Sequence, residues 1–479
     1  MDAKSTNRRF NEAKLMNMLE YRLGFILTSR RHQLDNQSFL HRWNRLLTPG
    51  FKLFVHPESS IHRVEGTDGH TIVAIGDIFV AHGGETLDTL LARLASGERA
   101  PLDSLAGRFA IFILRGRDGA VVHDPLGSQA VFYRLGPSPI VASHSSLIAD
   151  CDSLSPSPDI KRFMASDEYR SKVTRFLPGD LSAYSEIVHL IPNNELDLRS
   201  GATSRYWPRE AIRASSFEDL IEVWDEYFAA YAKFLSGRYN PVIGLTGGVD
   251  SRAIIATLHS LGVRAKYITW DKMPAEEAAR IPVLADYLGG EHEWVHMSMR
   301  PSTPEANEIR EAARNATGLT RGTPLLPAQI APLLEKRSLF VKGLGGEVMR
   351  GPFNSRVKAH LPQEPESLAY ALYAGEVRKT ASKAYEVATR SAIRSYLARG
   401  NYDTNLFDAD FGDLVYWEQR MGTWTAVQHA EFSVVLASHS AMNSRKLFAA
   451  AWGLPDDERL ESGLIERIIA YYDPTFAAM

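Results

Sequence analysis

NPVIGLTGGVDSRAIIATLHSLG, residues 240–262, is the stretch from which the fold can be predicted. Residues 241–245 form a short apolar run with two β-branched side chains, which is typical of a buried strand. Two glycines interrupt this run, and apolar side chains then return at helical spacing over residues 251–261. The order of strand, glycine turn and helix predicts one unit of an α/β sheet.

The glycine turn has the features of an anion site. Glycines let backbone N–H groups approach a phosphate closely, and the amino end of the following helix adds partial positive charge. Thr246 and Ser251 can donate hydroxyl hydrogen bonds, while Asp250 fits a site where Mg²⁺ accompanies the phosphate. No Gly-Lys-Ser/Thr follows, so the loop is not of the Walker type. The alternative is a βα unit whose glycines only form a tight turn.

Composition limits the class of protein. The chain has 479 residues, 44% hydrophobic and 23% charged, which is ordinary for a globular protein of two or three domains. A net charge of −3 gives no electrostatic case for nucleic acid as a partner. No apolar run has the length of a membrane span or the form of a signal peptide. With Cys151 as the one cysteine, we expect a cytoplasmic protein without a membrane partner.

The first 208 residues alternate short apolar runs with turns, and residues 85–95 are amphipathic. This pattern predicts an α+β domain built on antiparallel sheets. The expected strands are residues 22–29, 51–55, 71–79, 109–114, 120–123 and 130–135.

From residue 209 onward, strands and helices alternate. Strands expected at 265–270, 292–297 and 338–342, with a helix at 275–287, predict a doubly wound parallel sheet whose ligands bind at the carboxyl ends of the strands. Trp270 ends one of these strands, where nucleotide contact and core packing are both open. Residues 365–398 and 413–450 have helical periodicity and predict a helical C-terminal part.

Two segments of this half carry a resemblance. Residues 246–251, Thr-Gly-Gly-Val-Asp-Ser, resemble the pyrophosphate loop Ser-Gly-Gly-x-Asp-Ser of ATP pyrophosphatases. Residues 343–351, Gly-Leu-Gly-Gly-Glu-Val-Met-Arg-Gly, resemble the second pyrophosphate-binding segment of asparagine synthetases, and Glu347 falls on the magnesium-binding aspartate of that family. Residues 320–324 resemble a family segment beside the active site, although Thr323 before Pro324 is also an ordinary helix start.

The first half resembles the class II glutamine amidotransferase domain of the same family. Residues 75–79, 105–110 and 123–127 match its landmarks in order and spacing. The glutaminase chemistry is missing, because Asp2 stands where the family has its nucleophilic cysteine and Val80 where it has an oxyanion-binding asparagine. Acidic neighbours on both sides predict a raised pKa and poor nucleophilicity for Cys151.

The resemblance to the asparagine synthetase superfamily, which includes β-lactam synthetases and lasso-peptide cyclases, implies a fold and a set of roles. It implies a degenerate amidotransferase-like domain of Ntn-hydrolase type over residues 1–208 and an ATP-pyrophosphatase domain over residues 209–479. It implies ATP and Mg²⁺ as cofactors, with the metal on Asp250 and Glu347. The expected nucleotide-binding residues are Leu245, Thr246, Gly247, Gly248, Asp250, Ser251, Trp270, Gly343 and Gly345.

The expected catalytic residues are Asp250, Glu347, Arg350 and Lys446. Family members place a catalytic lysine near the end of the chain, and here no lysine follows Lys446. Lys446, Lys342 or Arg350 could take its role, although Arg350 can also be read as a surface arginine.

These readings imply an AMP-forming amide ligase of natural-product biosynthesis. It would adenylate a small-molecule or peptide carboxylate and join it to an amine, within one substrate or between two, without using glutamine. The alternative is a catalytically weak nucleotide-binding scaffold in a biosynthetic complex. A biosynthetic partner protein and a homodimer both remain open.

Overall fold

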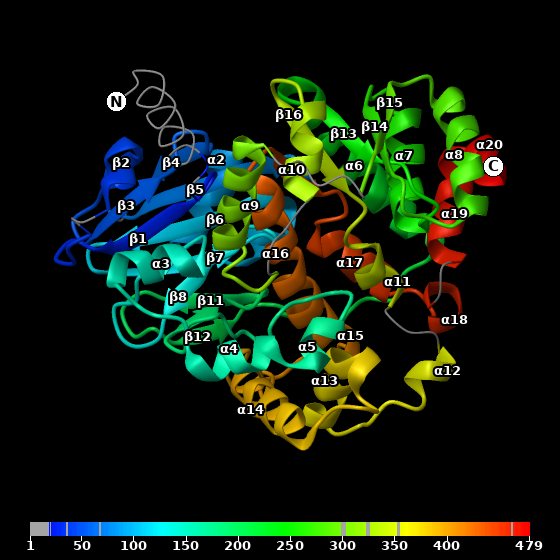
Figure 1. The fold of residues 1–479 in the computed structure, drawn as a ribbon. Coiled ribbons are helices and arrows are strands. Elements are labelled where there is room, and N and C mark those ends of the chain that lie inside the picture. Colours follow the sequence, from blue (N-terminus) through cyan, green and yellow to red (C-terminus); the bar gives the residue numbers. More distant parts are fainter. Residues whose placement is uncertain are drawn as a thin grey trace, which may run out of the picture.

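The structure is a computed structural model that describes residues 19, 21–34, 37–66, 69–297, 303–321, 326–351, 355–460 and 463–479. Two six-stranded antiparallel sheets form the N-terminal half, and a five-stranded parallel sheet lies in the C-terminal half (Figure 1). The expected combination of an antiparallel first half and a parallel second half is therefore confirmed. In the described part of the chain, no helix is long and apolar enough to cross a membrane.

The first antiparallel sheet has the order β10-β8-β9-β1-β3-β2. Its strands are β1 (Phe25–Ser29), β2 (Asn44–Leu47), β3 (Phe51–Val55), β8 (Phe132–Arg134), β9 (Val141–Ala142) and β10 (Ile187–His189). The second has the order β12-β11-β7-β6-β5-β4. Its strands are β4 (Ile61–Glu65), β5 (Thr71–Val80), β6 (Leu105–Arg115), β7 (Asp118–His123), β11 (Asn194–Asp197) and β12 (Thr203–Arg205).

An apolar core joins the two antiparallel sheets. Phe25 and Leu53 of the first sheet belong to one buried cluster with Phe112 and Val121 of the second. The alternation of apolar and polar residues along these strands turns one face of each sheet toward this core. All six expected strands are present. The strand expected from residue 22 begins instead at Phe25, because positive φ angles at Tyr21 and Leu23 place a turn there.

The parallel sheet has the strand order β15-β14-β13-β16-β17. Its strands are β13 (Asn240–Gly244), β14 (Lys266–Trp270), β15 (His292–Val295), β16 (Ser338–Lys342) and β17 (Ala437–Ser440). The chain moves outward in one direction from β13 to β15, and then in the other from β16 to β17. Such an order has its switch point between β13 and β16, where open α/β sheets bind their ligands.

Several helices position this sheet. The helix before β13 is α6 (Phe217–Arg238), which begins at a capping box of Ser216 and Asp219. The helix after β13 is α7 (Val249–Ser260), and the helix after β14 is α8 (Ala275–Leu288), which continues through Pro282. In Figure 1, α8 lies on the outer side of the sheet with the C-terminal helices α19 (Gly463–Tyr472) and α20 (Pro474–Ala478).

The helical region expected over residues 413–450 requires a correction. It contains α16 (Gly422–Ser433) and α17 (Arg445–Trp452), but β17 lies between them and completes the parallel sheet. Its residues, Ala-Ser-His-Ser, have no apolar alternation. The strand forms because it pairs in parallel with β16 and is buried there.

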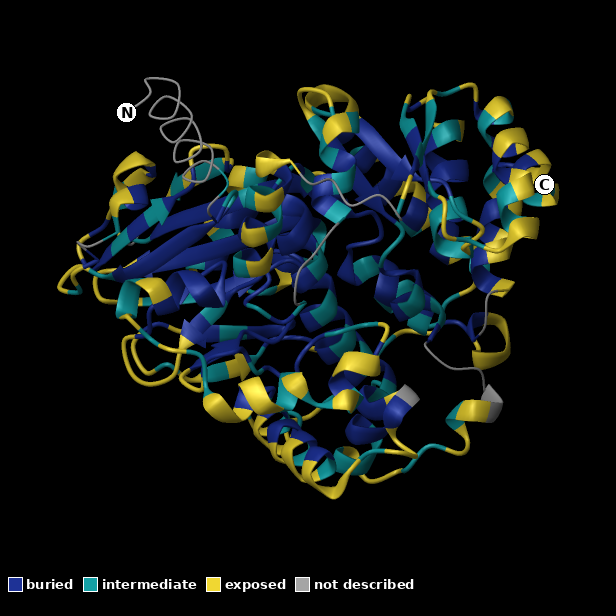
Figure 2. Cartoon of the chain, viewed as in Figure 1, coloured by how far each residue is buried: buried dark blue, intermediate teal, exposed yellow. Residues whose placement is uncertain are grey.

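The two halves share one hydrophobic core. Leu91 and Phe109 of the first half belong to the same buried cluster as Trp224, Ile254 and Trp417 of the second. Figure 2 shows the buried residues running through the strands of both halves, with exposed residues on the outer helices. The site at the parallel sheet is therefore held by both parts of the chain.

Candidate functional site

Two glycine-containing segments meet where β13 and β16 end. A Cβ atom on Gly343, directly after β16, would lie 2.8 Å from the backbone nitrogen of Ser251. A Cβ atom on Gly346 would lie 2.1 Å from Oδ1 of Asp250. Since real side chains do not tolerate such distances, these two glycines are what lets the segment after β16 touch the amino end of α7. Distant parts of the sequence thus form one site at the switch point.

The turn after β13 is held by its own hydroxyl groups. The oxygens of Thr246 and Ser251 lie 2.8 Å apart, and the Ser251 hydroxyl donates to the carbonyl oxygen of Gly248 at 2.8 Å. The backbone nitrogen of Gly248 donates to the hydroxyl of Thr246 at 3.3 Å. Gly248 is the N-cap residue of α7 and offers no side chain to its first N–H groups. The amino end of α7 therefore keeps donors that an anion can use.

Asp250, Glu347 and Arg350 form a charged cluster beside this turn. Nη2 of Arg350 lies 3.3 Å from Oδ2 of Asp250. The other oxygen of Asp250 and Oε2 of Glu347 are buried and have no hydrogen-bond partner in the described part of the chain. Glu347 and Arg350 come from the short helix α11 (Gly346–Arg350), which follows β16. Sequence and structure agree that the two acids come together.

Burial raises the pKa of both acids. For Asp250 it outweighs the opposing effect of the Arg350 guanidinium, and for Glu347 the negative charge of Asp250 raises the pKa further. Two neighbouring acids of like charge, with Arg350 bound only to Asp250, favour a further cation beside them. Their orphaned oxygens suit a divalent cation such as Mg²⁺, which prefers carboxylate, phosphate and water oxygens. No third histidine, cysteine or acid joins them among the residues with described positions, so phosphate and water oxygens would complete the coordination.

A cavity of about 290 Å³ opens next to this cluster. Six residues that the sequence predicts for the site line it: Thr246, Gly248, Asp250, Ser251, Trp270 and Gly343. Further lining comes from residues that the sequence did not assign to nucleotide binding. These are Gly244, Leu326, Phe340, Val341, Lys342, Leu344, Gln428 and Phe432. Only Lys342 was a candidate beforehand, because the others carry no motif.

Three residues that the sequence predicts to contact the nucleotide do not line this cavity. Leu245 is buried in the core, and its backbone nitrogen and oxygen are bound to Ile268 and Thr269. Gly345 has a φ of +111° and lies against the carbonyl oxygen of Met442. Gly247 is exposed beside the cavity. Trp270 combines both expected roles, because its half-buried ring lines the cavity and meets the ring of Phe340 edge-on at 6.0 Å.

Lys446 lies elsewhere. It lines a separate cavity of about 410 Å³ with Trp207 and Arg209, near the junction of the two halves. The structure therefore does not bring Lys446 into the cavity of Asp250. Of the segment at 320–324, residues 322–324 lie outside the described residues, so its expected role has no structural counterpart here.

Glu277 is a site residue that the sequence did not indicate. This residue of α8 accepts a hydrogen bond from the backbone nitrogen of Gly247 at 2.6 Å. A Cβ atom on Gly247 would lie 2.8 Å from the carboxylate carbon, so the two residues are in close contact. A carboxylate of the chain thus occupies one of the N–H donors that a phosphate would use.

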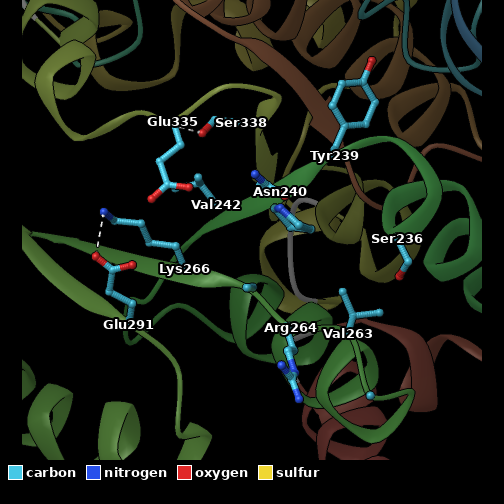
Figure 3. A pocket seen from close by; sticks show the side chains of 13 residues that line it. Ser236, Tyr239, Asn240, Val242, Val263, Arg264, Lys266, Glu291, Glu335 and Ser338 are labelled. Atoms are coloured by element: carbon cyan, nitrogen blue, oxygen red, sulfur yellow. Dashed lines mark hydrogen bonds and ion pairs between the residues drawn. The ribbon is translucent and has the colours of Figure 1, made fainter.

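A larger cavity, of about 480 Å³, lies at the opposite edge of the parallel sheet (Figure 3). It is lined by the first residues of β13, β14 and β16, which are Asn240, Lys266 and Ser338. The amine of Lys266 is bound to Glu291 at 3.1 Å and to Glu293 at 2.9 Å. Its charge is satisfied within the chain, and the cavity lies away from the switch point.

In the first half, the prediction for Cys151 is confirmed. Burial, Asp150 and Asp152 raise the pKa of its thiol to about 12. A thiol of this kind is protonated at neutral pH and is a poor nucleophile.

Comparisons with known proteins leave the family open. No protein-family model matches the chain, and no curated protein matches it. Among solved structures, the chain is similar to glutamine phosphoribosylpyrophosphate amidotransferase from B. subtilis, complexed with ADP and GMP. Identity is 11%, the TM-score is 0.23, and 71% of this chain and 73% of that chain are covered. A second structure, described as the allosteric regulatory enzyme of purine biosynthesis, has 11% identity, a TM-score of 0.24 and 73% coverage of both chains. TM-scores this low support no argument about family or function.

Proposed function

We propose that the protein is an ATP-dependent ligase that activates a carboxylate with release of AMP and pyrophosphate and joins it to an amine. One observation carries this proposal. Two half-buried acids, Asp250 and Glu347, each with one buried oxygen that has no hydrogen-bond partner among the described residues, follow the ends of β13 and β16 at the switch point of a parallel sheet, beside a glycine turn and a cavity. Such an arrangement is suited to a nucleotide that carries a divalent cation.

Each group of the site has a role in this reaction. Asp250 and Glu347 would hold Mg²⁺, which would offset charge on the departing pyrophosphate. The amino end of α7 and the hydroxyls of Thr246 and Ser251 would orient the phosphates. Arg350, already bound to Asp250, would oppose the effect of burial on the pKa of that carboxylate and hold it in place. The aromatic walls of the cavity would exclude water from the activated carboxylate.

The first half would contribute structure rather than ammonia. Val80 does not supply the oxyanion donor of a glutaminase, and the thiol of Cys151 is protonated. The amine would therefore come from the carboxylate substrate itself or from a second molecule. Holding both reacting groups in one cavity would supply much of the rate. The Ntn-hydrolase-like and ATP-pyrophosphatase assignments of the two halves belong to this proposal.

The test is calorimetric titration of the full chain with ATP, with and without Mg²⁺. We expect Mg²⁺-dependent binding, weakened at least tenfold by Asp250→Asn. Asp286→Asn, an exposed acid of α8, is the matched control and should bind as the wild type does. Release of AMP and pyrophosphate is then screened with pairs of carboxylates and amines. An ATP affinity that changes neither with Mg²⁺ nor with the Asp250 substitution contradicts the proposal.

The second candidate is a nucleotide-binding scaffold with little catalysis, which the contact between Glu277 and Gly247 favours. A carboxylate that satisfies the turn from within the chain gives a stable structure without phosphate. Glu277→Gln separates the two functions, with the exposed Glu276→Gln as its control. A ligase should bind ATP several-fold more tightly once the competing charge is gone. A scaffold should show no gain and lose thermal stability.

A further inference from the structure

Lys342 presents a buried amine to the cavity. It is the last residue of β16, its side chain is 7% exposed, and it lines the cavity directly before Gly343. Its Nζ donates to the side-chain oxygen of Gln428 at 2.9 Å and lies 3.7 Å from the ring centroid of Phe432. The amine is thus held in place by a neutral amide and an aromatic face.

This amine lacks a counterion. Across the described ranges, no acid forms an ion pair with Lys342 within 4.0 Å. Glu431, whose negative charge acts on Lys342, is itself paired with Arg321 at 2.8 Å. A buried cation without a charged partner is destabilising, because it loses its hydration and gains no opposite charge in return. Lys266, at the opposite edge of the same sheet, is paired with Glu291, as Figure 3 shows, and also with Glu293.

The surroundings of Lys342 weaken its charge. Burial lowers its pKa to about 7, Glu431 opposes this effect, and the positive charges of Arg321 and Arg108 lower the pKa further. His429, on the same helix as Gln428, has a pKa well below its ordinary value because it is buried and near these cations. On the neighbouring strand β17, His439 lies opposite Val341, and its side chain is hydrogen-bonded to Asp77 rather than to Lys342. The cavity is therefore lined by an amine whose pKa lies near neutral pH.

The other residues that line the cavity indicate which kind of ligand the amine of Lys342 would meet. Trp270, Phe340 and Phe432 line the cavity with Leu326. Aromatic and aliphatic walls favour a planar apolar body, and one cationic donor among them favours a single anionic group on that body. The phosphate-facing turn of Thr246 to Ser251 borders the same space.

We propose that Lys342 binds the anionic group of the ligand, a phosphate or a carboxylate oxygen, while the aromatic walls hold the planar body attached to it. This inference rests on the proposed function only for the identity of the ligands as a nucleotide and a carboxylic acid. Anion binding supplies the missing counterion and so favours the protonated amine. Binding therefore takes up a proton wherever the free amine is neutral.

The experiment is calorimetry on the full chain without Mg²⁺, in two buffers that differ in ionisation enthalpy, at pH 6 and pH 8. The probes are AMP against adenosine, and benzoate against benzamide. With benzoate we expect uptake approaching one proton at pH 8 and almost none at pH 6, with affinity falling up to tenfold per pH unit above about pH 7. AMP should show the same uptake at pH 8, while at pH 6 its own phosphate also titrates, since the second pKa of a phosphomonoester is about 6. The neutral probes should show neither effect. A response to AMP identifies phosphate as the bound group, and a response to benzoate identifies carboxylate.

Two variants and one control complete the test. Lys342→Met should weaken binding of the anions at least tenfold at pH 6 and abolish proton uptake. Lys342→Arg keeps a permanent charge, so its affinity should not fall between pH 7 and pH 8. Lys266→Met should behave as the wild type. Anion binding without proton uptake, or unchanged in Lys342→Met, overturns the inference. Because Mg²⁺ and Asp250 take no part, a failure of the ligase proposal would be seen separately.

Discussion

At the scale of single residues, the charged side chains of the site could be predicted from the sequence, but not all of the residues that they contact. Asp250 and Glu347 could be found because each follows a strand and a glycine, and a parallel sheet brings such positions together. Glu277 could not be found, because its contact with Gly247 spans 30 residues and depends on where α8 lies. Gln428 is likewise 86 residues from Lys342, on a helix whose sequence marks no site.

From the raised pKa of Glu347 we predict how the stability of the folded protein changes with pH. An acid whose pKa is higher in the folded than in the unfolded protein costs no stability below its unfolded value, near 4.3 in general. The cost grows as pH rises from there through the folded pKa. Glu347→Gln should therefore match the wild type near pH 4 and be more stable at pH 7, by about 1 kcal/mol.

Thermal unfolding between pH 4 and pH 7.5 checks this expectation. The same variant should lose Mg²⁺-dependent ATP binding, so stability and binding should change in opposite directions. A melting temperature below that of the wild type at pH 7 would show that the carboxylate of Glu347 stabilises the fold.

At the scale of elements, strands could be predicted where apolar residues are continuous. Residues 51–55 and 338–342 match β3 and β16 completely. The polar strand β17 could not be predicted in this way. Its Ser438 and Ser440 are stabilised by hydrogen bonds to His429 at 2.7 and 2.9 Å and by pairing with β16, none of which exists locally in the sequence.

The contact between α11 and α7 can be tested through glycine. Gly346→Ala should be destabilising by roughly 1–3 kcal/mol and should weaken nucleotide binding, because its Cβ would overlap Oδ1 of Asp250. Gly237→Ala is the matched control near the end of α6, where no atom lies within 4 Å of the added Cβ. It should be neutral or slightly stabilising. Thermal melting of both variants decides the matter, and equal effects would mean that the two segments do not touch.

At the scale of the whole molecule, the predicted division at residue 208 coincides with the change of sheet type. It does not separate two hydrophobic cores. The sheets are antiparallel before this point and parallel after it, as expected. The core is nevertheless continuous across it, since Phe109 and Trp224 belong to one buried cluster. Periodicity reports which face of an element is buried and not what covers it, so the shared core could not be predicted from the sequence.

A buried ion pair joins the two halves. Arg205 of β12 binds Glu418 at 2.6 and 2.8 Å, and their side chains are 3% and 0% exposed. Arg205→Met should lower stability by about 3–5 kcal/mol, because it leaves the Glu418 carboxylate buried without its partner. Arg199→Met breaks the exposed pair with Asp118 and should change stability by less than about 0.5 kcal/mol.

Calorimetry should show the two halves unfolding in one transition in the wild type and in both variants. The doubly substituted Arg205→Met, Glu418→Met chain should recover part of the lost stability. Two separate transitions in the wild type would contradict the shared core.

The low reactivity of the Cys151 thiol has a practical consequence. Thiol-directed dyes and spin labels react with thiolates, so at neutral pH this protonated, partly covered side chain offers them almost no target. A cysteine introduced at an exposed position, such as Val283 on α8, would carry a fluorophore or nitroxide alone. Movement of α8 against its surroundings could then be followed on the unmodified sequence background, one molecule at a time.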